Sequence, residues 1–160
     1  RIIVLLRNPV DRAYSHYLHE RSRGHEALTF EDALAAEPQR LEGLENRLAT
    51  GELLVSDVHK RASYVERGRY ARQLERWLSV FPRDQLLILR SEDLYADPVG
   101  VTQQVTDFLG LAPLEIAAFS THNATSGPPM QASTREMLER EFAAENAQLA
   151  AILGWDPGWS

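Results

Sequence analysis

An unbroken run of apolar residues at positions 2–6 is followed at once by Arg7, Asn8 and Pro9. Such a run is typical of a parallel strand covered on both faces, although a buried turn of helix has the same pattern. The next residues favour the strand, because Asn8 is a good N-cap and Pro9 fits the first position of a helix. The sequence therefore predicts a buried strand that passes directly into a helix, with Arg7 at the junction.

The first half of the chain is expected to be mainly helical. The helix after Asn8 presents one apolar face at helical spacing, formed by Val10, Ala13, Tyr14, Tyr17 and Leu18. A second helix is expected from Phe30 to about residue 37, because Thr29 and Asp32 resemble a capping pair and Pro38 ends the pattern. Residues 39–62 have weak periodicity, so we expect a helical or irregular excursion there.

The second half returns to strong patterns. A helix from about residue 68 ends at Phe81-Pro82, and its expected core face consists of Tyr70, Leu74, Trp77, Leu78 and Phe81. A strand is predicted at 85–89, a helix from Asp97-Pro98 to Gly110, a loop at 112–130 and a last helix at about 134–153. This alternation predicts an α/β domain with a mostly parallel sheet. Because the chain starts inside a strand, we expect the domain to be incomplete at its N-terminus.

Composition excludes several classes of function. The net charge of −6 argues against a nucleic-acid partner, since such a surface is normally basic. There is no cysteine, and His16 and His19 lack a third ligand at suitable spacing, so we expect no metal site. No apolar run approaches the roughly 20 residues of a bilayer span, so a soluble, cytoplasmic protein is expected. Lys60 is the single lysine and lies outside any glycine-rich stretch, which excludes a lysine-based phosphate loop within this chain.

Arg7 occupies the place where α/β sheets gather ligands, at the end of a strand and the start of a helix. Its guanidinium would contact two phosphate oxygens at once, and the hydroxyl of Ser15, two turns further on, would add a donor. The alternative is structural: Arg7 pairs with a carboxylate such as Asp11 or Glu92, and Ser15 is a surface hydroxyl. The residues alone leave both interpretations open.

Residues 7–17, Arg-Asn-Pro-Val-Asp-Arg-Ala-Tyr-Ser-His-Tyr, closely resemble a motif of the sulfotransferase family. In that motif, an arginine at the end of a strand and a serine eight residues later hold the 3′-phosphate of the sulfate donor. The resemblance to heparan-sulfate-type and bacterial sulfotransferases continues along nearly the whole chain, through Ser63-Tyr64, Gly68-Arg69-Tyr70, Trp77-Leu78, Phe81-Pro82, Asp97-Pro98, Pro129-Met130, Arg135, Phe142 and Leu153-Gly154.

The resemblance implies a P-loop-NTPase-like three-layer α/β fold, of which residues 1–160 form the C-terminal part of a single domain. It also implies transfer of a sulfuryl group from 3′-phosphoadenosine-5′-phosphosulfate to a hydroxyl or amine of a small-molecule or carbohydrate acceptor, with no metal. Arg7 and Ser15 would bind the 3′-phosphate. The family's glycine-rich loop and catalytic base precede this motif, so we assign no catalytic residue here and expect the fragment alone to be inactive.

The late loop departs from the family pattern. Many relatives have a basic Lys-Gly-Arg-like segment that wraps the donor, where this chain has Asn-Ala-Thr-Ser-Gly at 123–127. Backbone N–H groups and the hydroxyls of Thr125 and Ser126 would still cover a phosphate, and Phe119 would pack on the adenine. An ordinary polar loop and a core phenylalanine are the alternatives. For the whole chain, the alternatives are a P-loop-like kinase that uses ATP and a degenerate, non-catalytic binding domain.

Overall fold

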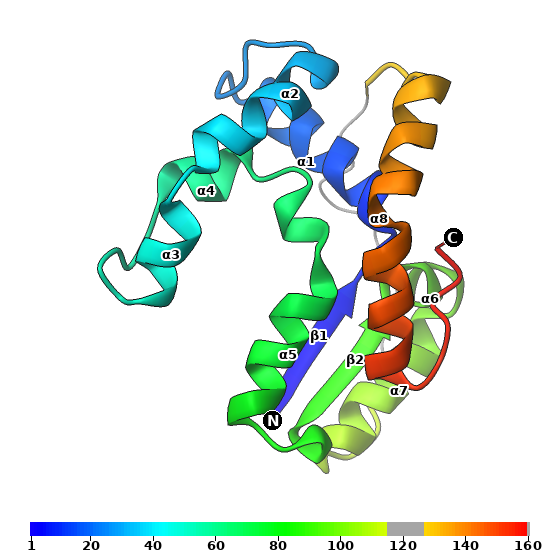
Figure 1. Cartoon of the computed structure of the whole chain (residues 1–160). Coiled ribbons are helices and arrows are strands. Elements are labelled where there is room, and N and C mark those ends of the chain that lie inside the picture. Colours follow the sequence, from blue (N-terminus) through cyan, green and yellow to red (C-terminus); the bar gives the residue numbers. More distant parts are fainter. Residues whose placement is uncertain (115–126, 160) are drawn as a thin grey trace. The chain divides into compact units, whose positions relative to one another are not determined.

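The computed structural model describes residues 1–114 and 127–159 (Figure 1). They form two compact units, each with a hydrophobic core of its own. The sheet unit comprises residues 1–8, 70–114 and 145–159, and the helical unit comprises residues 9–69 and 127–144. Each unit is described separately.

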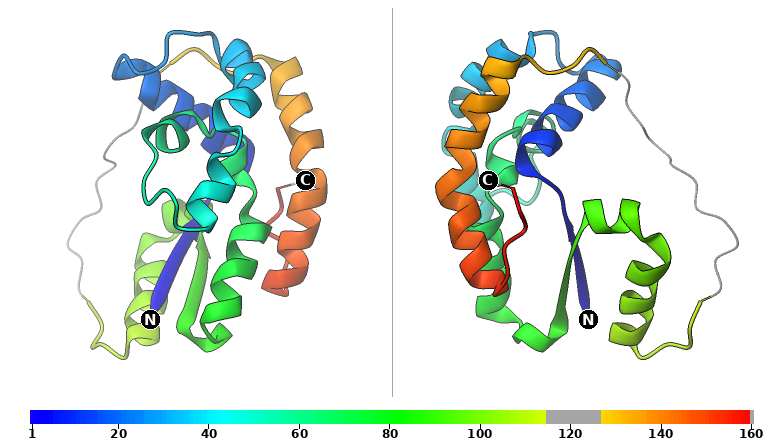
Figure 2. Two further views of the ribbon diagram at one scale, coloured as in Figure 1. Left: turned by 60° about the vertical axis from the view of Figure 1, so that its left-hand side comes forward. Right: turned by 90° about the vertical axis from the view of Figure 1, so that its right-hand side faces the viewer.

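The sheet unit contains the two strands β1 (Ile2–Leu6) and β2 (Leu86–Arg90), which pair in parallel with Ile2 opposite Leu86 and Leu6 opposite Arg90. Helix α5 (Tyr70–Val80) and the last part of α8 (Ala132–Leu153) lie on one face of the strands, and α7 (Pro98–Leu109) lies on the other (Figure 2). The core is formed by Leu6, Tyr70, Ala71, Leu74, Leu86, Ile88, Leu149, Leu153 and Trp159. The predicted α/β fold with a parallel sheet between helical layers is confirmed.

The helical unit is built around α1 (Pro9–Ser22) and α2 (Phe30–Leu41), followed by the short helices α3 (Leu44–Ala49) and α4 (Asp57–Ala62) and the 3₁₀ turn η1 (Glu66–Gly68). Its core contains Val10, Ala13, Tyr17, Phe30, Ala33, Leu34, Tyr64, Leu138 and Phe142. The predicted apolar face of α1 is confirmed, with Tyr14 and Leu18 packed at its margin. Short helices within residues 39–62 agree with the expected excursion.

The sequence predicts that helix α2 ends before Pro38. In the structure the helix continues to Leu41. Proline removes a hydrogen bond from a helix and crowds the preceding turn, so contacts outside the helix must offset that cost. Such contacts occur on both sides of Pro38. Glu37 is buried and accepts the backbone N–H groups of Val65 and Glu66, while Arg40 donates to Glu26.

Three further details of the sheet unit differ from expectation. Trp77 is predicted to lie in the core but is 46% exposed. Its ring stacks on that of Phe81, with the ring centroids 5.6 Å apart. The second strand begins at Leu86 because Gln85 ends the 3₁₀ turn η2 (Arg83–Gln85). The strand is followed directly by α6 (Ser91–Ala96), a short helix without a strong apolar pattern that the sequence does not predict.

Candidate functional site

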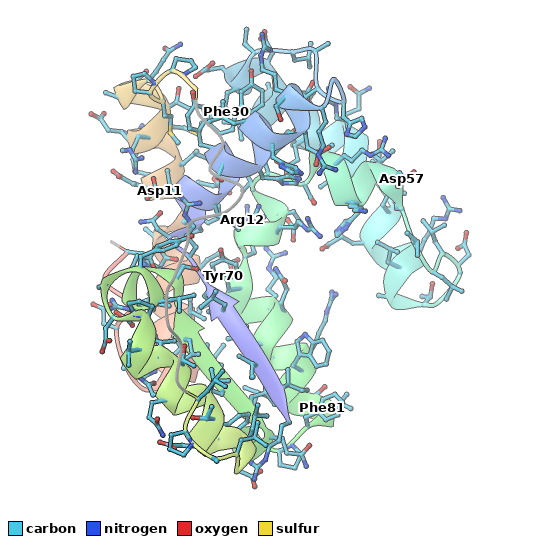
Figure 3. The ribbon with its side chains drawn as sticks, turned by 180° about the vertical axis from the view of Figure 1, so that it is seen from behind. Asp11, Arg12, Phe30, Asp57, Tyr70 and Phe81 are labelled. Atoms are coloured by element: carbon cyan, nitrogen blue, oxygen red, sulfur yellow. The ribbon has the colours of Figure 1, made fainter. Side chains whose placement is uncertain are left out.

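Arg7 follows β1 directly, as predicted, and its main chain is held from two directions within the sheet unit. The Tyr70 hydroxyl, which lies near the carboxyl end of β1 (Figure 3), donates to the Arg7 carbonyl oxygen at 2.9 Å. The Asn8 N–H donates to Oε1 of Glu92 at 2.8 Å. Because the two strands are parallel, their carboxyl ends lie at one edge of the sheet, which brings Glu92 after β2 close to Asn8 after β1.

Asp11 and Glu92 are the carboxylates that would pair with Arg7 if its role were structural, but both make other contacts. Asp11 accepts a hydrogen bond from Arg135 at 2.6 Å, and Glu92 accepts the Asn8 N–H. Within residues 1–114 and 127–159, the half-exposed Arg7 guanidinium forms no ion pair with a carboxylate. A cation without a carboxylate partner at the end of a strand suits an anionic ligand, so the local structure fits the phosphate interpretation of Arg7.

Ser15 is a half-buried residue of α1 in the helical unit. Hydrogen bonds fix α1 within that unit: Arg12 donates to the Tyr64 carbonyl oxygen at 2.6 Å, and the Tyr14 hydroxyl donates to the Pro128 carbonyl oxygen at 2.6 Å (Arg12 is labelled in Figure 3). Arg7 belongs to the sheet unit and Ser15 to the helical unit. Their joint contact with one phosphate stays a prediction.

Three further residues are predicted to bind the donor. Phe119, Thr125 and Ser126 lie outside the described residues, so their roles also stay predictions. For the metal prediction, no cluster of three or more His, Cys, Asp or Glu side chains that would hold an ion occurs in the described portion of the chain. Over the same portion, no helix has the length and apolar character needed to cross a membrane.

The helical unit also contains a buried polar network that sequence reasoning missed. The Glu26 carboxylate accepts hydrogen bonds from Arg40 at 2.5 Å, from the Tyr64 hydroxyl at 2.8 Å and from the Leu28 N–H at 3.1 Å. Burial alone would raise the pKa of Glu26, but these hydrogen bonds outweigh it and lower the pKa to about 2. The spacing of these residues gave no signal, because partners up to 38 positions apart form the network.

His16 lies beside this network on α1. Its ring meets the ring of Tyr64 edge-on at 5.1 Å, and its Nε2 lies 3.8 Å from Oε1 of Glu20. Burial, followed by the positive charges of Arg12 and Arg67, lowers the pKa of His16 to about 4. The histidine is therefore neutral at pH 7 and packs as part of the protein interior.

Tyr70 and Glu92 contact the main chain at Arg7 and Asn8, whereas the sequence predicts other roles for both residues. Tyr70 was expected only as a core residue, and its ring is indeed buried, but its hydroxyl reaches the Arg7 main chain. Glu92 was considered as a partner for the Arg7 guanidinium and instead binds the backbone of Asn8. A buried tyrosine normally requires a partner for its hydroxyl, which is the one signal that pointed to such a contact.

Comparisons with known proteins agree on one family. The profile described as "Sulfotransferase domain" matches residues 1–148. The chain is 31% identical over 179 residues to human bifunctional heparan sulfate N-deacetylase/N-sulfotransferase 3, covering 96% of this chain and 19% of that protein. It is 32% identical over 166 residues to human carbohydrate sulfotransferase 15, covering 96% of this chain and 30% of that protein.

A solved structure gives the same result. The sulfotransferase from Alicyclobacillus acidocaldarius superposes with a TM-score of 0.73 at 32% identity, and the match covers 99% of this chain and 57% of that one. The chain thus spans less than a third of the length of either human relative. The family match, the order of the elements and the strand-to-helix junction at Arg7 are consistent with one another, and the chain belongs to the sulfotransferase domain family.

Proposed function

We propose that this sulfotransferase uses 3′-phosphoadenosine-5′-phosphosulfate as its donor and that Arg7 and Ser15 bind the donor's 3′-phosphate. The observation that carries the proposal is the place of Arg7: it directly follows β1, its main chain is fixed by Tyr70 and Glu92, and Ser15 follows on the next helix. The motif that resembles the family's 3′-phosphate site thus coincides with an anion-accepting position of the fold.

The role of these residues is to bind and orient. A hydrogen bond to a charged group contributes about 1.5–3 kcal/mol, and an arginine supplies two in parallel to a phosphate. The 3′-phosphate is remote from the sulfur atom, so this binding energy fixes the donor in place without taking part in bond breaking. Orientation of donor and acceptor in line is the main requirement for transfer of a group of this kind.

The test uses the full-length protein and two nucleotides that differ only in the 3′-phosphate. By calorimetry, Arg7→Ala is expected to weaken adenosine 3′,5′-bisphosphate about 10- to 100-fold, as loss of a charged hydrogen bond predicts, and to leave adenosine 5′-monophosphate nearly unchanged. Arg76→Ala, an exposed arginine on α5, serves as the matched control. Equal losses for both nucleotides would reject the assignment of Arg7.

We further propose a carbohydrate acceptor. Two human relatives are named as a heparan sulfate N-sulfotransferase and a carbohydrate sulfotransferase, and each matches 96% of this chain. The full-length protein, incubated with donor labelled in its sulfuryl group, is expected to label a polysaccharide such as heparosan or chondroitin and not a small phenol. Label only in the phenol would reject the carbohydrate, and no transfer to any acceptor despite donor binding would favour a non-catalytic binding domain.

A further inference from the structure

The two polar groups of a single peptide unit, the one that joins Arg7 to Asn8, are each held by a side chain. Its carbonyl oxygen accepts from the Tyr70 hydroxyl at 2.9 Å, and its N–H donates to Glu92 Oε1 at 2.8 Å. In a trans peptide these groups lie in the peptide plane and point in opposite directions, so Tyr70 and Glu92 bind opposite edges of the same peptide unit. Together they set the orientation of that plane.

Both side chains stand on helices of the sheet unit. Tyr70 is only 7% exposed and belongs to the core of the sheet unit, where its ring lies 6.0 Å from that of Trp159. Glu92 lies in the first turn of α6, directly after β2, and a hydrogen bond to a carboxylate is shorter and stronger than a neutral one. The peptide plane is therefore held by groups from the two elements α5 and α6, which the sheet unit places around the end of β1.

Glu92 carries a cost that fold stability alone does not explain. Its second oxygen, Oε2, is a buried atom, and among the described residues it has no hydrogen-bond partner. Burying an unsatisfied carboxylate oxygen is unfavourable, and an unsatisfied buried group in a native protein calls for an explanation.

We propose that Tyr70 and Glu92 are positioning residues of the donor site, which hold the Arg7–Asn8 peptide so that the Arg7 guanidinium is aligned for the 3′-phosphate. This inference rests on the proposed function of Arg7. The peptide plane sets the backbone torsion of Arg7 on its carboxyl side, and the guanidinium stands at the end of a long side chain. A modest rotation of the plane therefore displaces the guanidinium and spoils a contact that requires two parallel hydrogen bonds.

The experiment compares nucleotide affinities in the full-length protein. Tyr70→Phe keeps the core ring and removes only the hydroxyl. It is expected to weaken adenosine 3′,5′-bisphosphate about 3- to 10-fold, the effect of one neutral hydrogen bond, with no change for adenosine 5′-monophosphate. Glu92→Ala should act in the same direction, while Glu92→Gln keeps an acceptor oxygen and should restore the wild-type ratio of the two affinities. Tyr95→Phe, at a residue that is 70% exposed, is the matched control.

A double-mutant cycle separates positioning from a general structural role. In an Arg7→Ala background, Tyr70→Phe is expected to have no further effect on the ratio of the two affinities, because the guanidinium that it aligns is gone. The proposal is overturned if Tyr70→Phe weakens both nucleotides equally, or if it lowers the ratio as much without Arg7 as with it. A failure of the proposed function is distinguishable, because Arg7→Ala alone would then leave the ratio unchanged.

Discussion

The two units bury different kinds of side chain. The sheet unit is closed mainly by aliphatic residues of its strands and helices, among them Leu6, Leu74, Leu86, Ile88, Leu149 and Leu153. The helical unit buries a group of aromatic rings, Tyr17, Phe30, Tyr64 and Phe142, together with the carboxylates of Glu20, Glu26 and Glu37. The first core depends on apolar area removed from water, whereas the second also depends on matching each buried charge to a donor.

The contrast has a physical reason in the shapes of the elements. Parallel strands pack apolar side chains against helices, and the apolar residues of β1 and β2 fill such a core on the face that α5 and α8 cover. The helical unit has no sheet among its described residues, and its long segments between helices bring backbone N–H groups inside. Glu37 accepts two of them, from Val65 and Glu66, and Glu26 accepts that of Leu28. Two of the three buried carboxylates thus satisfy main-chain donors that lack a sheet or helix partner.

The largest effect is expected for Glu26→Ala in the helical unit. This change leaves the buried Tyr64 hydroxyl and the partly exposed Arg40 without their shared acceptor, and the loss for a fully buried ion pair, about 3–5 kcal/mol, is the upper limit of the cost. Urea unfolding measures the loss. Glu52→Ala, which removes an exposed partner of Arg47, is the matched control and should cost no more than about 1 kcal/mol. Similar losses for both variants would contradict the polar account of this core.

For the sheet unit, Leu74→Ala is expected to cost about 3 kcal/mol. The residue is 2% exposed within the aliphatic core, and the loss combines the transfer of the removed methyl groups with the cavity they leave. Urea unfolding again measures it. Leu54→Ala, at a residue that is 88% exposed, should change the stability by less than about 0.5 kcal/mol. If both leucines behave alike, burial in this core is not what stabilises it.

Acid is expected to weaken the helical unit through His16. Its pKa is about 4 in the folded protein, against 6.5 for an ordinary histidine, so between these values the unfolded chain binds a proton that the folded chain does not. Stability therefore falls as the pH falls, by about 2 kcal/mol between pH 7 and pH 5. Glu26, with a pKa of about 2, adds a loss only below about pH 4.5.

Urea unfolding at several pH values, with hydrogen exchange resolved on separate peptides, measures this effect. His16→Gln should flatten the profile between pH 7 and pH 5, and peptides from α1 and α2 should lose protection before those from β1 and β2. Burial raises the pKa of Glu37, which acts in the opposite direction, but it is common to wild type and variant and cancels in their difference. An unchanged slope in His16→Gln would refute the assignment.

The smallest effects are expected at two helix caps, one in each unit. The side chain of Asp97 accepts the Gly100 N–H at the start of α7, and that of Thr29 accepts the Asp32 N–H at the start of α2. Loss of such a cap costs about 1 kcal/mol, so Asp97→Ala and Thr29→Ala should each lose about that amount in urea unfolding. Equal losses would show that the two units differ in their cores but not in the strength of their helix caps. A loss several times larger in one unit would contradict that conclusion.

Features that depend on local signals were predictable from the sequence, whereas features that depend on distant contacts were not. The strand at 2–6, the helix start at Pro9 and the helix end at Gly110 depend on local signals, and the positions of all three are confirmed. The predicted burial of that strand on both faces is wrong, because Ile3 is 42% and Leu5 is 48% exposed. The continuation of α2 past Pro38 depends on contacts with distant residues, so local signals gave the wrong end. Trp77 fits the apolar stripe of α5 yet is exposed, because periodicity identifies a face of a helix but not how much of it is covered.

The candidate site shows the same limit. The place of Arg7 follows from the apolar run and the helix start that flank it, so it was predictable. The contact of Tyr70 with the Arg7 carbonyl joins residues 63 positions apart and was not. A hydrophobic stripe specifies that a tyrosine ring is inside, but the direction of its hydroxyl depends on tertiary packing. The sequence thus predicts where Arg7 stands but not the side chains that hold its main chain.

The burial of Trp159 makes the end of the sheet unit part of this arrangement. Its ring lies against that of Tyr70, and its carbonyl oxygen accepts a hydrogen bond from Asn146 at 2.8 Å. Substitutions that dislodge Trp159 would free the Tyr70 ring to tilt, and with it the hydroxyl that reaches Arg7. Nucleotide affinities measured on variants altered at Trp159 would then report the packing of this ring as well as any direct contact with the nucleotide.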